Sequence, residues 1–176
     1  MHCNSIDYNE SLQQIVIGSR SMSEFYIIDH STTTTQASSS SGGIYGRGGD
    51  FLYRWGNPQV YNKGNSSNRR LFGQHDVQWI EDGLADEKKI LIFNNGQSRG
   101  YSSVEIVNTQ FQNSGYYQLS TIGTFIPDSS EWIYVADNPT DFFSSYISGA
   151  QRLKNGNTLI CDGAHGTFFE IDKNKS

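Results

Sequence analysis

QHDVQWI, at residues 74–80, and KILIFNNG, at residues 89–96, carry the clearest fold signal of the chain. His75 begins a short strand-like run, a turn rich in acidic residues and glycine follows, and the second run ends in two amides and a glycine. Short β-branched or aromatic runs bounded by turn residues are typical of strands. These residues therefore predict two consecutive strands joined by a turn.

The same layout occurs twice more in the chain. It is found upstream in HCNSID and QIVIGSR, and downstream in SGAQRL and NTLICDG, at residues 2–7, 14–20, 148–153 and 157–163. His2 lies 73 residues before His75, and Ser148 lies 73 residues after it (75 − 2 and 148 − 75). Equal offsets with matching strand ends indicate an internal repeat.

Each repeat continues into further strand-like runs. We expect these strands at residues 24–29 and 50–58, at 103–107 and 132–139, and at 168–172. Both fourth runs are aromatic and end in Asn-Pro. Tandem four-stranded units are typical of β-propeller blades. The predicted fold is therefore all-β, a single partial β-propeller domain over residues 1–176 with antiparallel blade repeats at about 1–61, 74–140 and 148–174.

The chain contains fewer than three complete blades, which is too few to close a propeller ring. Propellers typically close with about four to eight blades. We expect this chain to be the C-terminal part of a longer protein, whose signal peptide would lie outside it, or to form a ring from several copies. The extra length of the repeats lies in residues 31–49 and 110–130, and the first of these is rich in Ser, Thr and Gly and is expected to be a surface loop.

Composition restricts the partners. The chain has 13 Lys and Arg against 18 Asp and Glu, a net charge of −5, which argues against a nucleic acid or an anionic membrane as a ligand. No apolar run approaches the roughly 18 residues of a membrane span. Cys3 and Cys161 lack a CxxC spacing, so neither a disulfide nor a thiol metal site is predicted, and both are expected to be buried and inert.

The histidine that starts each of the first two repeats is the candidate for chemistry. In a propeller the innermost strands line a central channel, so His2, His75 and Ser148 would surround a common axis. The third repeat carries serine, which shows that the blade itself does not require histidine there. A histidine near neutral pH can act as a nucleophile or carry a proton. A purely structural hydrogen bond from His75 to the neighbouring Asp76 is the alternative.

Arginine and asparagine accompany these histidines. Asn4 shares a strand face with His2 because side chains alternate along a strand. Arg20 ends the second strand of its repeat, and its equivalents are Asn95 and Gly163. Arg presents a fork of donors that matches sulfate or phosphate oxygens, so the cluster indicates an oxyanion ligand.

Other catalytic motifs are missing from the sequence. The four histidines show no HExxH spacing or local cluster, so no metal site is predicted. His30 and His165 are expected in loops, the latter exposed. The sequence lacks a GxSxG elbow, and the glycines of residues 43–49 do not match a phosphate-loop spacing.

Several segments together resemble a known family. The segments are residues 2–9, 28–33, 48–58, 74–76, 93–96 and 147–153. In order and spacing they resemble the bacterial arylsulfotransferase (aryl-sulfate sulfotransferase) family over nearly the whole chain. The resemblance implies a six-bladed propeller that moves a sulfuryl group from a phenolic sulfate ester to a phenol, without a nucleotide sulfate donor or another cofactor. It also implies ping-pong kinetics through a sulfated histidine.

The resemblance also assigns roles to residues. By motif match His75 would be the nucleophile, and His2 and Arg20 would be catalytic residues at the sulfate and leaving group. The substrate-binding positions would be Asn4, Asn95 and Ser148, and Asp76 would orient His75. Family sites also use a histidine from an earlier blade, so this chain alone is expected to be inactive. Family members are often periplasmic.

Two other readings remain open at this point. The first is a non-catalytic propeller whose channel binds a sulfated or otherwise anionic ligand. The second is a truncated gene product without activity. A covalent sulfo-histidine would distinguish the enzyme from both. The sequence does not identify the donor or the acceptor phenol.

Overall fold

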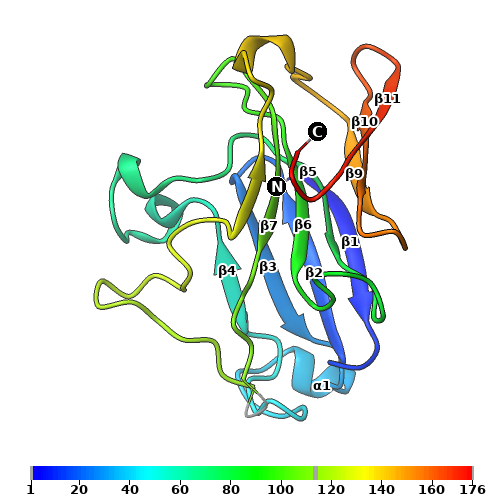
Figure 1. The fold of residues 1–176 in the computed structure, drawn as a ribbon. Coiled ribbons are helices and arrows are strands. Elements are labelled where there is room, and N and C mark those ends of the chain that lie inside the picture. Colours follow the sequence, from blue (N-terminus) through cyan, green and yellow to red (C-terminus); the bar gives the residue numbers. More distant parts are fainter. Residues whose placement is uncertain (1, 113–114, 176) are drawn as a thin grey trace.

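Three antiparallel sheets make up the computed structural model, which describes residues 2–112 and 115–175 (Figure 1). The first sheet contains β1 (Cys3–Asn9), β2 (Gln14–Ser19), β3 (Glu24–Asp29) and β4 (Tyr53–Trp55). The second contains β5 (His75–Trp79), β6 (Ile90–Asn94), β7 (Ser103–Val107) and β8 (Trp132–Tyr134). The third contains β9 (Gly149–Arg152), β10 (Thr158–Asp162) and β11 (Thr167–Ile171).

The predicted all-β fold is confirmed, and its strands form antiparallel sheets of four, four and three strands. Each predicted strand is present, and β3 and β7 have the predicted bounds. The fourth strands, β4 and β8, are shorter than predicted, because the Asn-Pro that follows each of them begins a short 3₁₀ helix (Pro58–Tyr61 and Pro139–Asp141). Proline suits the first position of a helix, where its missing N–H needs no partner.

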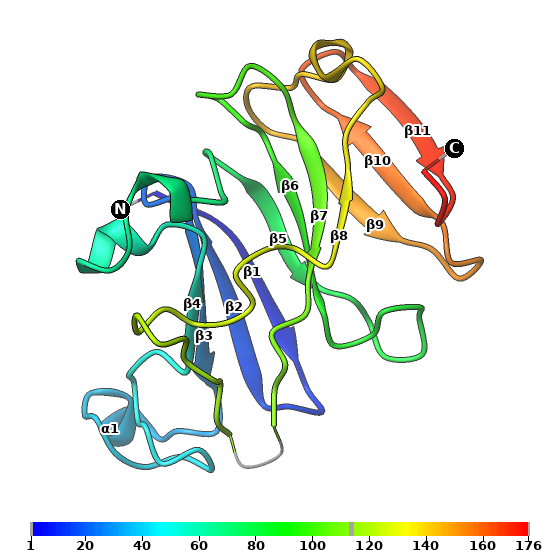
Figure 2. The same cartoon turned by 60° about the vertical axis from the view of Figure 1, so that its left-hand side comes forward.

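The sheets stand side by side, with β1, β5 and β9 as neighbours (Figure 2). Side chains from one sheet bind the backbone of the next. The Ser5 hydroxyl accepts from the Val77 N–H at 3.1 Å, and the Asp7 carboxylate accepts from the Trp79 N–H at 2.8 Å. Because these strands end their sheets, the contacts satisfy N–H groups on an otherwise open edge.

Apolar side chains fill both spaces between the sheets. In β6, Ile90 and Ile92 belong to the core shared with the first sheet, whereas Leu91 and Phe93 belong to the core shared with the third. A strand with two buried faces reads as a continuous apolar run, which explains the sequence ILIF. The second sheet is therefore the centre of the molecule.

The long connection between β7 and β8 returns to the first sheet. Its Tyr117 is buried and donates its hydroxyl to the Gln14 side chain at 2.6 Å. The Ile126 and Pro127 carbonyls accept from Tyr53 and Trp55 at 3.0 and 2.7 Å. This loop closes the outer side of the first interface. The other long loop, residues 31–49, is largely exposed as predicted, and contains one short helix, α1 (Thr34–Ala37), with a Thr33 capping box.

The prediction that both cysteines are buried is wrong. Cys3 is exposed and Cys161 is half-buried, and both are free thiols. Cys3 lies where β1 begins with a shift in register, and Cys161 faces the open side of the third sheet. Among the described residues there is no helix with the length and apolarity needed to cross a membrane.

Candidate active site

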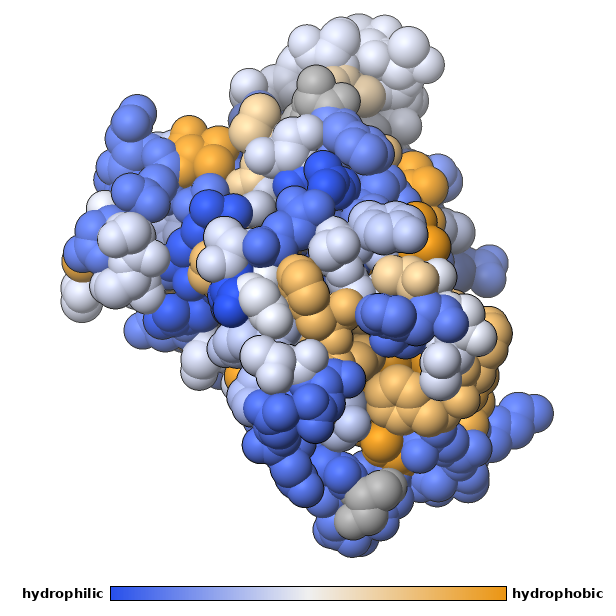
Figure 3. Space-filling view, turned by 90° about the horizontal axis from the view of Figure 1, so that it is seen from above, coloured by the Kyte–Doolittle hydropathy of each residue, from blue (hydrophilic) through white to orange (hydrophobic). Residues whose placement is uncertain are grey.

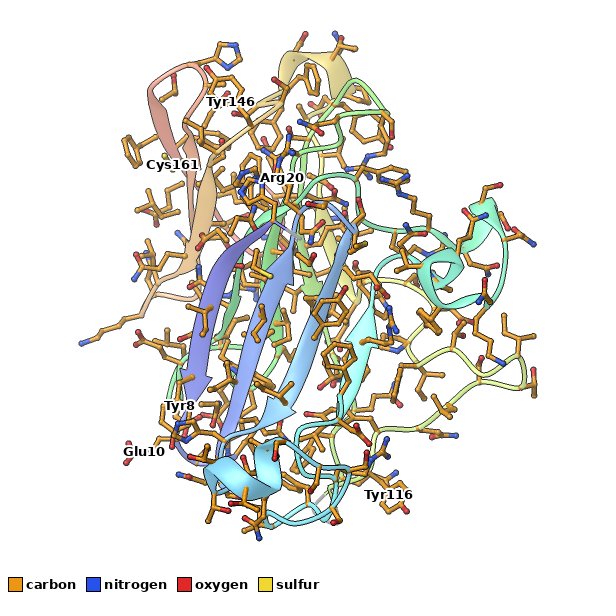
Figure 4. All side chains as sticks on the ribbon, turned by 180° about the vertical axis from the view of Figure 1, so that it is seen from behind. Tyr8, Glu10, Arg20, Tyr116, Tyr146 and Cys161 are labelled. Atoms are coloured by element: carbon orange, nitrogen blue, oxygen red, sulfur yellow. The ribbon has the colours of Figure 1, made fainter. Side chains whose placement is uncertain are left out.

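Antiparallel pairing gathers the predicted site residues at one end of the sheets. Cys3 pairs with Ser19, His75 with Phe93, and Gly149 with Cys161. The residues at the start of each first strand therefore lie beside those at the end of each second strand. These neighbours are His2 and Arg20, His75 and Asn95, and Ser148 and Gly163. Figure 4 shows Arg20 at this end, with Tyr146 and Cys161, and Tyr8 and Glu10 at the opposite end.

A buried amide holds the ring of His75. The Nδ1 atom of His75 lies 2.8 Å from the Oδ1 atom of Asn95. The Nδ2 group of Asn95 donates to the carbonyls of Ser144 and Ile147, both at 2.8 Å. Because these two carbonyls can only accept, the amide oxygen must face the ring, and neutral His75 must donate from Nδ1. The Nε2 atom then carries the free lone pair that a nucleophile needs.

The surroundings of His75 favour the neutral ring. Burial, the largest effect, lowers the pKa of His75, and the positive charges of Arg20 and His2 lower it further. The hydrogen bond to Asn95 and an interaction with the Gly73 backbone partly oppose this decrease in the pKa. The net result is a pKa below the ordinary value of His75. His75 is thus an uncharged, half-buried base beside two groups that can carry positive charge.

Arg20 and His2 are less enclosed than His75. Arg20 is half-buried, His2 is exposed, and the Arg20 N–H donates to the His2 carbonyl at 3.0 Å. The His2 N–H donates to the Ser21 hydroxyl at 2.9 Å. Both contacts use the backbone of Arg20 and His2, and within residues 2–112 and 115–175 neither the guanidinium nor the imidazole has a hydrogen bond.

The side chain of Asn4 is hydrogen-bonded to the backbone next to His75. Its Nδ2 group donates to the Gln74 carbonyl at 2.8 Å, and its buried Oδ1 atom has no hydrogen-bond partner among the described residues. Asn4 lies at a shift in the register of β1, and β5 has a similar shift after His75. Such bulges redirect side chains and are common next to active sites.

Asp76 points to the third sheet. Its Oδ2 atom accepts from the Ala150 N–H and from the Gln78 amide, both at 2.9 Å. Burial raises the pKa of this carboxyl, and the hydrogen bonds from Ala150 and Gln78 oppose that increase. The residue that hydrogen-bonds the His75 ring is Asn95, whereas the carboxylate of Asp76 links neighbouring sheets.

Ser148 takes part in a hydroxyl pair at the start of the third repeat. Its Oγ atom lies 2.7 Å from that of Ser144 and accepts from the Gly163 N–H at 2.9 Å. Sequence reasoning missed Ser144 and Ile147, which position Asn95 through their carbonyls. Backbone carbonyls carry no sequence signal, so only the unusual run before the third repeat, SSYIS at residues 144–148, could have drawn attention to them.

A groove of about 1020 Å³ runs along β1 and β5 from this end to the other. Asn4 and Asp76 line it near His75, and carboxylates line its far end. The far-end carboxylates are Asp7, Glu10, Glu81 and Asp82. Since Arg20, His2 and His75 lie at the opposite end, an anionic ligand is favoured there and disfavoured at the acidic end.

The other two histidines lie outside this cluster. His30 is exposed, and its ring lies 4.5 Å from the ring of Tyr8. The His165 side chain is 61% exposed, as expected, and its Nδ1 atom lies 2.9 Å from an Asp162 carboxylate oxygen. Within residues 2–112 and 115–175, no three His, Cys, Asp or Glu side chains are grouped so that they could hold a metal ion.

Comparison with known protein families identifies the family of this chain. A family model described as Arylsulfotransferase (ASST) matches residues 1–176, the whole chain. Among curated proteins, none matches the chain.

Proposed function

Because this chain belongs to the arylsulfotransferase (ASST) family, we propose that it is the part of an aryl-sulfate sulfotransferase that carries the nucleophile, His75. The enzyme moves a sulfuryl group from a phenolic sulfate ester to a phenol, without a nucleotide donor. The observation that carries this proposal is the Asn95 amide, which leaves His75 Nε2 unprotonated beside Arg20.

In the first half-reaction the Nε2 lone pair of His75 attacks sulfur. The new N–S bond forms as the bond between sulfur and the phenolic oxygen breaks, and the phenolate leaves. The Nδ1 proton stays on the ring and remains hydrogen-bonded to Asn95, which stabilises the positive charge that the ring gains. Arg20 holds the sulfuryl oxygens through charge-assisted hydrogen bonds.

The remaining site residues transfer protons at the leaving group or hold the backbone of the site in position. His2 donates a proton to the departing phenolate and accepts one from the acceptor phenol in the second half-reaction. The phenol oxygen then attacks sulfur, the N–S bond breaks, and neutral His75 is restored. Asn4 keeps the Gln74 backbone, and with it the start of β5, in position.

The sheets would be three blades of a six-bladed propeller. Apolar side chains on the outward faces of the first and third sheets support this reading, since Ile6 is 72% exposed and Phe168 is 67% exposed. Further blades, from the same polypeptide or from other copies of the chain, would cover these faces and complete the channel. We propose the periplasm as the site of action, because family members are typically found there.

Mass spectrometry of the full-length protein after brief mixing with 4-nitrophenyl sulfate, without an acceptor, tests this function. We expect a mass gain of one sulfuryl group on His75, released when a phenol is added. The His30→Ala variant is the matched control, because His30 is an exposed histidine outside the cluster. Binding of the ester by folded protein without any adduct would reject the enzyme in favour of a non-catalytic anion-binding propeller.

A further inference from the structure

Residues 144–148, which we call the strap, have an unusual backbone. Ile147 and Ser148 have φ values of 47° and 82°. Consecutive positive φ angles are rare outside glycine, and for a β-branched residue such as Ile147 they are a clear outlier. A conformation of this kind persists only where the surrounding structure enforces it, and it is concentrated at functional sites.

Hydrogen bonds from Asn95, to Ser102 and within the strap itself hold this backbone in place. Asn95 donates to the carbonyls at both ends, those of Ser144 and Ile147. The Ser144 N–H donates to the Ser102 hydroxyl at 2.9 Å, and the hydroxyls of Ser144 and Ser148 lie 2.7 Å apart. The strap is therefore a rigid element even though it lies outside the sheets.

The result of this arrangement is an exposed apolar surface next to the nucleophile. Tyr146 is 52% exposed and Ile147 is 47% exposed. One side chain, Asn95, bridges the His75 ring and the Ile147 carbonyl, with 2.8 Å on each side. Tyr146 lies at the same end of the molecule as Arg20 (Figure 4). Figure 3 shows this end from above, where apolar residues emerge among polar ones.

We propose that Tyr146, supported by Ile147, is the platform on which the aromatic ring of the sulfate ester or phenol packs. This inference rests on the proposed function. Arg20 and His75 account for the sulfuryl group, but neither recognises an aryl group. A tyrosine ring offers a flat, rigid surface, and aromatic pairs gain stability beyond simple burial. The strap would thus determine selectivity for aryl over alkyl sulfates.

Calorimetric titration of the full-length protein with two non-reacting ligands tests this role. The first ligand is 2-naphthalenesulfonate, whose sulfonate group cannot be transferred because it is attached through a C–S bond. The second ligand is inorganic sulfate. We expect Tyr146→Ala to weaken the binding of naphthalenesulfonate by about twofold to tenfold and to leave sulfate binding unchanged. Tyr146→Phe, which keeps the ring, should bind both ligands like the wild type. Tyr116→Ala is the control, because Tyr116 is 70% exposed at the opposite end (Figure 4).

Three results would overturn the inference. These are unchanged naphthalenesulfonate binding in Tyr146→Ala, an equal loss for both ligands, and a wild-type protein that does not bind the sulfonate. The adduct experiment on His75 is independent of them. Selective binding through Tyr146 without an adduct would support the aromatic platform and reject the transferase function. An adduct together with unchanged ligand binding in Tyr146→Ala would support the transferase function and reject the platform.

Discussion

His2 and His75 occupy the same position of the repeat, yet their surroundings differ. The ring of His75 is half-buried and held by the amide of Asn95, which is anchored to the carbonyls of Ser144 and Ile147. His2 is exposed, and the hydrogen bonds that the structure gives it involve its backbone. A histidine at this position therefore becomes a candidate nucleophile only where the following sheet supplies the support.

The third copy extends the comparison. Ser148 replaces the histidine, and its hydroxyl accepts from the N–H of Gly163, the residue equivalent to Asn95. Here the hydroxyl is hydrogen-bonded to the backbone, and Gly163 has no amide side chain that could orient a ring. The three copies thus range from a supported ring, through an exposed ring, to no ring.

Replacing His75 or His2 with serine, the residue of the third copy, should give the largest difference in sulfuryl transfer between the two positions. His75→Ser removes the attacking atom, so we expect transfer to fall at least about 10³-fold and the sulfo-enzyme to disappear. His2→Ser removes only a proton carrier, and we expect a loss of about 10²-fold with a slowly formed adduct. Stopped-flow release of 4-nitrophenol measures both. An adduct that persists in His75→Ser would show that another residue is the nucleophile.

The equivalent residues Asn95 and Arg20 should differ in their effect on stability. Asn95→Ala leaves the Ser144 and Ile147 carbonyls and the His75 N–H without their partner, so the free energy of unfolding should fall by about 3 kcal/mol. Arg20→Ala should change that free energy by less than about 0.5 kcal/mol, yet weaken sulfate binding by about tenfold or more. Urea unfolding and calorimetry check these values. Equal losses of stability would mean that Asn95 is not the support we describe.

The lowered pKa of His75 should be visible in the pH dependence of stability. An unfolded histidine titrates near pH 6.5, whereas the folded protein holds the pKa of His75 below its ordinary value. The unfolded state therefore binds more protons as the pH falls through this range, and the free energy of unfolding decreases. Urea unfolding between pH 5 and pH 8 should show this decrease in the wild type.

The same measurement on His75→Ser is the control for that assignment. We expect the variant to lose less stability than the wild type on acidification, because serine has no proton to gain. The rate of adduct formation should also decline on the acid side, with a midpoint below about pH 6.5. An identical pH profile of stability in the variant would assign the effect to other groups.

The smallest effect is expected for Asp76→Asn. An amide can still accept from the Ala150 N–H through its oxygen, so the link to the third sheet is kept. Burial raises the pKa of Asp76, so its ionisation costs stability as the pH rises through the folded pKa, and the neutral amide avoids that cost. At pH 7 we expect a change in the free energy of unfolding of less than about 1 kcal/mol. If Asp76→Asn shifted the acid side of the pH profile for the rate of adduct formation, Asp76 would be the residue that orients His75 after all.

The sheets were predictable because their signals are local. Alternating and continuous apolar runs, turn residues and the offset of 73 residues locate each strand, and the Asn-Pro pairs begin the short 3₁₀ helices that come after β4 and β8. The same repeat places His2, His75 and Ser148 at equivalent positions. Antiparallel pairing then requires Arg20 and Asn95 to lie beside the histidines, so the composition of the candidate site could be expected from the sequence as well.

The function of individual side chains within that cluster could not be read from the chain. Asn95 is linked to carbonyls 49 and 52 residues away, and Tyr117 to Gln14 across 103 residues. Asp76, a sequence neighbour of His75, turns instead towards Ala150. Periodicity specifies which residues form strands and which face is apolar, because both depend on the local backbone. The partner that orients a ring, and the strap that positions that partner, depend on which backbone carbonyls approach in space, and this is set only when the sheets pack together.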